Sequence, residues 1–113
     1  MATVAPKLVV KDYLDNTGAP DGGEYESLGL AIRWQRGPLK PPGETELMPP
    51  NGAFVETVIE AALRRLMFYQ TTRFACQENE VAIEHLKETL TCLNERTARR
   101  AAEGTLNTYK PDA

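Results

Sequence analysis

The sequence contains few of the residues that build disulfide and metal sites. Its 113 residues include 2 cysteines and 1 histidine. A disulfide framework in a chain this small would need more cysteines, so Cys76 and Cys92 are predicted to be buried thiols in a reducing compartment. Neither belongs to a CxxC pair or lies near a histidine pair, which gives a metal site little support. We therefore expect neither a metal nor another cofactor.

Enzymatic motifs are missing as well. No phosphate-binding loop of the GxxxxGK[ST] or GxGxxG type occurs. His85 lies among charged residues with no serine or cysteine at a suggestive spacing, so it is expected to be solvated or at a dimer edge. A nucleotide-cleaving enzyme is therefore an unfavoured alternative.

A basic excess and a long apolar run are also absent. The chain has 13 Lys and Arg against 16 Asp and Glu, for a net charge of -3. Domains that bind DNA or RNA in general are usually strongly basic. The slightly acidic balance of this chain therefore argues against that class, but it permits a local basic site. No apolar run reaches the roughly 18 residues of a membrane span, and Met1–Val10 does not resemble a signal peptide. A cytoplasmic protein without a membrane partner is expected.

An α+β fold is predicted in one domain, since a domain usually takes roughly 100 to 200 residues. Residues 1–50 are expected to form a small antiparallel β portion with loops, residues 51–105 a long helical hairpin, and residues 106–113 a tail. A strand at Leu106–Tyr109 is only weakly indicated.

Two strands are predicted in the β portion. Lys7–Lys11 is short and partly β-branched. Leu28–Gln35 alternates with period two. The segment between them, Asn16–Gly23, is predicted to be a turn-rich loop. The five prolines of Gly37–Pro50 exclude regular structure there. The apolar face of the second strand consists of Leu28, Leu30, Ile32 and Trp34.

Two helices are predicted to follow. The first has Asn51 as its N-cap and ends near Tyr69 or Gln70. A turn at Thr71-Thr72 leads to the second, from about Arg73 to Glu103, which Gly104 stops. The apolar stripe of the first helix consists of Val55, Val58, Ile59, Ala62, Leu63, Leu66 and Met67.

The second helix carries a seam with strict 4-3 spacing. A helix of 31 residues would be ~46 Å long, more than a small globule covers with its own chain, so homodimerisation through the helices is expected. The alternative for the middle of the seam is an ordinary hairpin or dimer core. Asn79 and Arg100 are polar where packing alone would select Leu or Ile. The seam consists of Asn79, Ile83, Leu86, Leu90, Leu93, Thr97 and Arg100.

Candidate binding residues gather at both ends of the second helix. At its C-terminal end, guanidinium groups suit phosphate, although they could instead offset the helix dipole and pair with carboxylates. At the hairpin turn, aromatic rings and an amide suit a nucleobase, although they could instead form a core cluster. The first group is Arg96, Arg99, Arg100, Gly104 and Thr105, and the second is Phe68, Tyr69, Arg73, Phe74 and Asn79.

These two groups cannot meet within one chain. Asn79 and Arg96 are ~25 Å apart along a helix, because each residue adds about 1.5 Å. An antiparallel dimer of the long helices would bring the turn of one subunit beside the arginines of the other. It would form two equivalent pockets by twofold symmetry.

Two short motifs occur in the helical half of the chain, FAC-x-EN at Phe74–Asn79 and RT-x-RR at Arg96–Arg100, which EGT follows at Glu103–Thr105. On these motifs, residues 28 to 105 resemble a family of phage anti-defence proteins known as sponges. Ile32–Leu39 and Asn51–Glu56 are similar to the anti-Thoeris branch, which holds cyclic ADP-ribose isomers. The related anti-CBASS branch holds cyclic oligonucleotides.

The resemblance implies a ligand pocket and a second site. It places Tyr69, Phe74 and Asn79 from one chain with Arg96 and Arg100 from its partner. Trp34, Arg33 and Arg36 are expected nearby. A second site for cyclic oligonucleotides, formed in a hexamer, would use Arg99, Arg100, Gly104 and Thr105. After Thr105, this sequence departs from the family pattern.

The function implied is non-catalytic sequestration of a cyclic nucleotide immune signal in the infected host. The ligand would be a cyclic ADP-ribose isomer, with cyclic dinucleotides and trinucleotides as a further class, and the effect would be to block Thoeris or CBASS signalling. The alternative is a structural or protein-interaction helical homodimer whose arginines are solvated.

Overall fold

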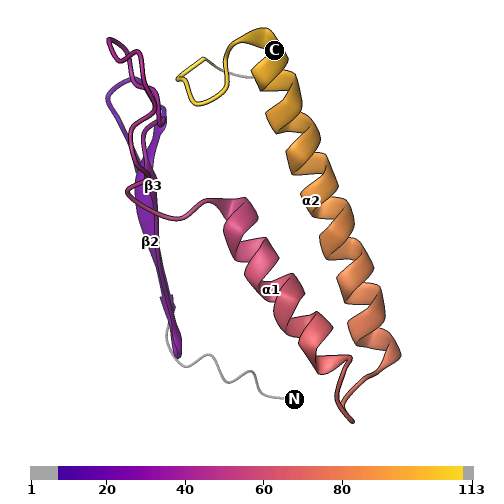
Figure 1. Ribbon diagram of the computed structural model, residues 1–113. Helices are drawn as coiled ribbons and strands as arrows, with labels where there is room; N and C mark the ends of the chain where they lie inside the picture. The colour runs from indigo at the N-terminus through magenta and orange to yellow at the C-terminus, as the bar shows by residue number, and fades with distance from the viewer. Residues whose placement is uncertain (1–7, 111–113) are drawn as a thin grey trace. The chain divides into compact units, whose positions relative to one another are not determined.

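The computed structural model describes residues 8–110 and confirms the predicted α+β class. Three strands precede two helices (Figure 1). The chain forms two compact units, one from the residues up to Phe54 together with those from Asn107 onward, and the other from Val55–Leu106. The elements are β1 (Val9–Leu14), β2 (Pro20–Ser27), β3 (Leu30–Arg36), α1 (Val55–Tyr69) and α2 (Gln77–Glu103).

The sheet is antiparallel, with the order β1-β2-β3. Its first strand confirms the prediction near Lys7–Lys11 but runs on to Leu14, while Lys7 lies outside the described residues. The prediction that a strand begins at Leu28 was wrong by two residues. Leu28 and Gly29 form the turn between β2 and β3, where Gly29 has a φ of 80°.

The middle strand was not predicted. Asn16–Gly23 was expected to be a loop, but β2 begins at Pro20. Gly23 pairs with Asp12 and Trp34 on its two sides, and a Cβ there would collide with the Lys11 carbonyl. Glycine at this position thus marks the close approach of a neighbouring strand rather than a loop.

The turn that does form between β1 and β2 is held by Asp15. Its carboxylate accepts hydrogen bonds from the Thr17 hydroxyl at 2.6 Å, from the Thr17 amide at 2.8 Å and from the Ala19 amide at 3.0 Å. The bond from the Thr17 hydroxyl is the main cause that lowers the pKa of Asp15 below its ordinary value.

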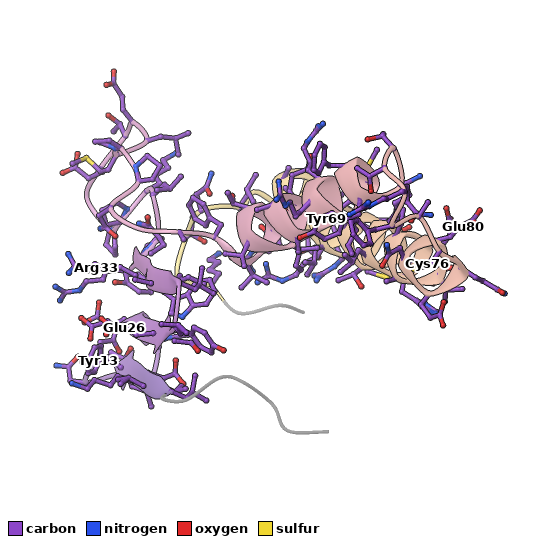
Figure 2. All side chains as sticks on the ribbon, turned by 90° about the horizontal axis from the view of Figure 1, so that it is seen from below. Tyr13, Glu26, Arg33, Tyr69, Cys76 and Glu80 are labelled. Carbon is purple, nitrogen blue, oxygen red and sulfur yellow. The ribbon has the colours of Figure 1, made fainter. Side chains whose placement is uncertain are left out.

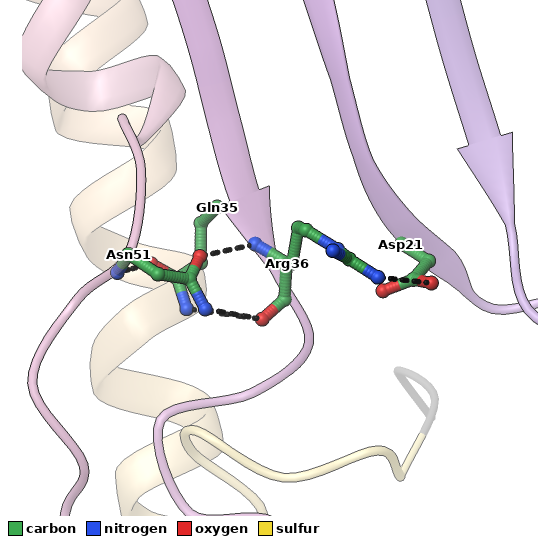
Figure 3. Close-up of polar contacts among 4 residues, drawn as sticks. All are labelled: Asp21, Gln35, Arg36 and Asn51. Atoms are coloured by element: carbon green, nitrogen blue, oxygen red, sulfur yellow. Dashed lines mark hydrogen bonds and ion pairs between the residues drawn. The ribbon is translucent and has the colours of Figure 1, made fainter.

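The segment that precedes α1 runs along β3 (Figure 3). The Gln35 amide donates to the Ala53 carbonyl at 3.0 Å, and the Ala53 amide donates to the Arg33 carbonyl at 2.8 Å. The Asn51 side chain accepts from the Arg36 amide at 2.8 Å and donates to the Arg36 carbonyl at 3.1 Å. The expectation that Asn51 caps α1 was therefore wrong, because its amide is bound to β3 and the helix begins at Val55.

The proline-rich segment is irregular, as predicted. In Gly37–Pro50 the Met48 amide donates to the Leu39 carbonyl at 2.6 Å, and the Lys40 amide donates to Asn107 at 3.0 Å. The strand indicated weakly at Leu106–Tyr109 is not formed, since these residues adopt turns and bends. Asn107 has a φ of 63°, which is incompatible with a strand.

The connection between the helices explains where α2 starts. The hydroxyl groups of Thr71 and Thr72 donate to the carbonyls of Phe68 and Tyr69 at 2.7 and 2.6 Å, which ends α1. The Gln70 amide group bonds to both the amide and the carbonyl of Cys76. The start expected near Arg73 was therefore wrong, because α2 begins at Gln77. The stop at Gly104, with a φ of 75°, is confirmed.

The core of the helical hairpin is small. Among the described residues, the buried hydrophobic side chains are Leu63 at 6% exposure and Ile83 at 7%. Figure 1 shows α1 along the half of α2 nearest the turn, which fits lengths of ~22 and ~40 Å at about 1.5 Å per residue. The predicted seam is the least exposed face of α2, except at Thr97, which is exposed.

The exposure of the cysteine and histidine side chains bears on two of the predictions. Cys76 and Cys92 are free but exposed, so the expectation of buried thiols was wrong. Cys76 lies in the connection and Cys92 on the outer face of α2. His85 is exposed near Glu88, with 3.8 Å between Nδ1 and Oε2, as expected for a solvated residue.

No helix within residues 8–110 has the length and apolar character needed to cross a membrane.

Candidate functional site

An exposed group of arginines and aromatic rings lies at the turn end of the helical hairpin. We call it the arginine–aromatic patch. The Arg65 guanidinium carbon lies 4.9 Å from the Phe68 ring centroid and 5.1 Å from that of Tyr69. The guanidinium of Arg73 lies 4.8 Å from the ring centroid of Phe74. Tyr69 is 37% exposed and Phe74 64%, so both rings are accessible to a ligand. The patch consists of Arg65, Phe68, Tyr69, Arg73 and Phe74.

Asn79 supports this patch from the first turns of α2. Its Nδ2 donates to the Phe74 carbonyl at 3.4 Å, and its side chain is half-buried. The structure thus brings together three of the expected ligand residues, namely Tyr69, Phe74 and Asn79, in one unit. Figure 2 shows Tyr69 at the same end of the hairpin as Cys76 and Glu80, which lie at the start of α2. The side-chain oxygen of Asn79 can also accept a hydrogen bond from a ligand.

The arginines at the other end of α2 differ in their surroundings. Arg96 is exposed. Arg99 forms an ion pair with Glu103 at 3.4 Å. Arg100 is only 5% exposed, and its Nη2 donates to the Thr105 carbonyl at 2.8 Å. Arg96 is thus an exposed residue, whereas Arg100 is enclosed by its own chain.

The backbone after α2 forms a helix C-cap. The amides of Gly104 and Thr105 donate to the carbonyls of Ala101 and Arg100 at 3.2 and 2.9 Å. The Thr105 hydroxyl also donates to the Arg100 carbonyl at 3.4 Å. An anion bound by these amides would have to replace bonds that satisfy the end of the helix.

The two ends of α2 do not meet within the unit. Because α2 is one helix from Gln77 to Glu103, Asn79 and Arg96 are separated by ~25 Å at about 1.5 Å per residue. A single small ligand therefore cannot contact both residues of one chain.

The remaining expected residues line a hollow in the sheet unit. Its volume is about 370 Å³. Arg33 pairs in register with Glu24 across β2 and β3, and Arg36 lies 3.5 Å from Asp21. Figure 2 shows Arg33 and Tyr13 on the same side of the sheet. Arg36 thus pairs with a carboxylate, and Glu24 is the cross-strand neighbour of Arg33. The lining residues are Tyr13, Asp21, Gly23, Glu24, Arg33, Trp34 and Arg36.

The sequence reasoning missed Arg65 in the patch and the carboxylates of the hollow. Arg65 precedes Tyr69 by four residues on a helix, and that spacing places two side chains on one face. Asp21 was assigned to a loop, so its pairing with Arg36 could not be anticipated. Within residues 8–110, no three His, Cys, Asp or Glu side chains gather in a group that could hold a metal ion.

Comparison with known proteins identifies relatives of this chain. The model of the hairpin domain of the Acb2/Tad1 family matches residues 28–98. Those residues include β3, α1, the hairpin turn and most of α2. The protein named Thoeris anti-defense 1 from Bacillus phage SBSphiJ7 is 35% identical over 79 residues. The match covers 70% of this chain and 51% of that relative, so the chain spans about half the length of the curated protein it matches.

Proposed function

This chain belongs to the Acb2/Tad1 hairpin family, and from that membership we propose that it is a phage anti-defence protein that sequesters a cyclic nucleotide signal. The family membership confirms the resemblance to this family, and the match includes the Phe74–Asn79 motif. The proposed ligand is a cyclic ADP-ribose isomer, with cyclic dinucleotides and trinucleotides as a further class. Binding would be non-catalytic and would withhold the signal from the host's Thoeris or CBASS effector.

The observation that carries this proposal is the match of residues 28–98 to the family model. The matched segment includes the arginine–aromatic patch, Asn79 and Arg96. A nucleotide presents a π face and phosphate oxygens, which suit an aromatic ring such as that of Tyr69 and a guanidinium such as that of Arg96. These two kinds of group occur at opposite ends of α2.

A shared pocket follows if two chains pair with their α2 helices antiparallel. Such pairing would bring Asn79 of one chain close to Arg96 of the other, twice by symmetry. The small core supports this assembly, because large apolar side chains such as Val55, Met67 and Val81 are about half exposed in one chain. We propose a homodimer, and a hexamer of three dimers for the second site at Arg99, Arg100, Gly104 and Thr105.

Native mass spectrometry of the protein with a panel of cyclic nucleotides tests the function. The panel comprises cyclic ADP-ribose isomers, cyclic dinucleotides and cyclic trinucleotides. We expect one ligand per shared pocket on a dimer or a multiple of dimers, and we expect denaturation to release the ligand chemically intact.

Two outcomes would contradict the proposal. A protein that stays monomeric at micromolar concentration has no shared pocket. A ligand recovered in cleaved form indicates an enzyme. The alternative of a structural helical homodimer is supported by the Arg99–Glu103 ion pair, and it predicts a dimer that binds no member of the panel.

Replacing Tyr69 tests the aromatic end of the pocket. If its ring stacks on a base, Tyr69→Ala should weaken binding by roughly 1 to 3 kcal/mol, the range for base stacking on an aromatic side chain. Tyr69→Phe keeps the ring and should bind nearly as the wild type does. Calorimetry measures both affinities, and light scattering checks that the oligomer is retained. Equal affinity for Tyr69→Ala and the wild type would assign Tyr69 to packing alone.

A further inference from the structure

The hairpin turn is a region of positive charge in an acidic protein. From Ala61 to Gln77 the chain has three arginines and no aspartate or glutamate, although the whole chain carries a net charge of -3. The three are Arg64, Arg65 and Arg73. Such a local excess attracts anions even when the whole molecule repels them.

Two neighbouring arginines of α1 differ in whether a carboxylate neutralises their positive charge. Arg64 forms an ion pair with Glu60, with 2.9 Å between Nε and Oε1. Within residues 8–110, Arg65 has no carboxylate oxygen within 4.0 Å. It instead lies over the rings of Phe68 and Tyr69, and its Nε donates to the Tyr69 hydroxyl at 3.3 Å.

This position leaves Arg65 able to bind an anion. A guanidinium stacks through its face and donates hydrogen bonds through its edges, so both interactions can occur together. The bond to Tyr69 uses Nε, and within the described part of the chain neither Nη atom of Arg65 donates a hydrogen bond to the protein. An anion approaching the ring of Tyr69 would thus meet two nitrogen donors without breaking an ion pair.

We propose that Arg65 is a further ligand-binding residue, which donates to a phosphate of the nucleotide whose base stacks on Tyr69. This inference rests on the proposed function and assigns the base and one phosphate to the same end of the pocket. The base would take the side of the Tyr69 ring that the guanidinium leaves open. Arg36 is less suited to this role, because its guanidinium lies 3.5 Å from the carboxylate of Asp21.

Arg65→Gln tests the assignment, with Arg64→Gln as the matched control one position away. The probes are cyclic ADP-ribose and cyclic di-AMP, titrated by calorimetry at low and at high salt. Loss of a charged hydrogen bond to phosphate should weaken binding by about 10- to 100-fold at low salt. The loss should shrink at high salt, because salt screens an exposed charge but not a stacking contact. Arg64→Gln should bind as the wild type does.

Arg65→Lys keeps the charge but not the planar fork, so its affinity should lie between those of the wild type and Arg65→Gln. If Arg65→Gln binds like Arg64→Gln, the inference is wrong while the proposed function stands. A loss that is equal at both salt concentrations also overturns the phosphate contact, because it shows that Arg65 acts only by holding the Tyr69 ring. A wild-type protein that binds no nucleotide of the panel overturns the proposed function and this inference together.

Discussion

Arg96→Ala is expected to weaken binding of the cyclic nucleotide by roughly 2 to 5 kcal/mol, the usual cost of removing one member of a buried, hydrogen-bonded charge pair. Asn79→Ala removes a neutral amide and is expected to cost roughly 1 to 3 kcal/mol, the range for a buried polar group that is left without its hydrogen bond. Arg96 would donate to a phosphate that the closed pocket removes from water, and without that donor the phosphate is left unpaired. Asn79 would lose both its contact with the base and its bond to the Phe74 carbonyl. Calorimetry on each homodimer measures the loss.

A mixed dimer distinguishes a shared pocket from a pocket within one chain. One chain carries Asn79→Ala and the other Arg96→Ala, with different affinity tags so that only the mixed species is purified. If each pocket takes Asn79 from one chain and Arg96 from the other, one pocket contains both substituted residues and the other pocket contains only wild-type residues. Half the binding stoichiometry should then return at native affinity.

The contrary result is equally clear. A mixed dimer without any site of native affinity would show that the pocket is not built from Asn79 of one chain and Arg96 of its partner. The antiparallel arrangement of α2 helices would then be wrong. A dimer of wild-type chains that carry the same two tags controls for effects of the tags on stoichiometry.

Leu63→Ala is expected to destabilise the protein by roughly 2 to 4 kcal/mol, because it removes a buried leucine and leaves a cavity. Leu63 and Ile83 are the buried hydrophobic side chains among residues 8–110, at 6% and 7% exposure. The loss is a large part of a total stability that is typically about 5 to 15 kcal/mol. Urea unfolding followed by circular dichroism measures it at a fixed protein concentration, since dimers unfold in a concentration-dependent way.

Thr57→Ala provides the control for Leu63→Ala. Thr57 is exposed on the same helix, so its replacement should change the free energy of unfolding by less than about 0.5 kcal/mol. If Leu63→Ala costs no more than Thr57→Ala, the contact between α1 and α2 is not the main source of stability. The stability would then have to come from contacts between chains.

The helices could be predicted well because their signals are local. The 4-3 seam from Asn79 to Arg100 gave the least exposed face of α2, and Gly104 gave its end. The errors lie at the helix starts. Asn51 has the residue type of an N-cap, but the β3 backbone, which is distant in sequence, binds its side chain. Pattern reasoning does not detect such a competing partner.

The β unit was harder to predict for a related reason. Pro20 and the two glycines of β2 are typical of a loop, and only the neighbouring strands make this segment part of a sheet. Glycine at position 23 is required by a backbone contact with Lys11, which a single sequence does not reveal. Strand pairing depends on residues far apart in the chain, whereas a helix depends on residues three or four apart.

The sequence predicted which residue types form the candidate site, but it did not predict which neighbours each of these side chains contacts. The sequence indicated Arg99 and Arg100 equally as phosphate donors, yet the structure has one in an ion pair and the other enclosed by the chain. It also gave no reason to separate Arg64 from Arg65. The difference arises from which neighbour each guanidinium meets, and that depends on side-chain geometry. Whether these residues bind a nucleotide stays a prediction.

The segment of Asn51–Ala53 along β3 has a consequence for solubility. An uncovered edge strand offers amides and carbonyls to the strands of other molecules, which promotes aggregation. Here Asn51 and Ala53 occupy backbone groups of Arg33, Gln35 and Arg36 that would otherwise template another strand. At the opposite edge, the register of β1 shifts between Asp12 and Leu14, and an irregular strand pairs poorly with a foreign one. Both edges of the sheet are thus poorly suited to pairing with the sheet of another copy of the chain.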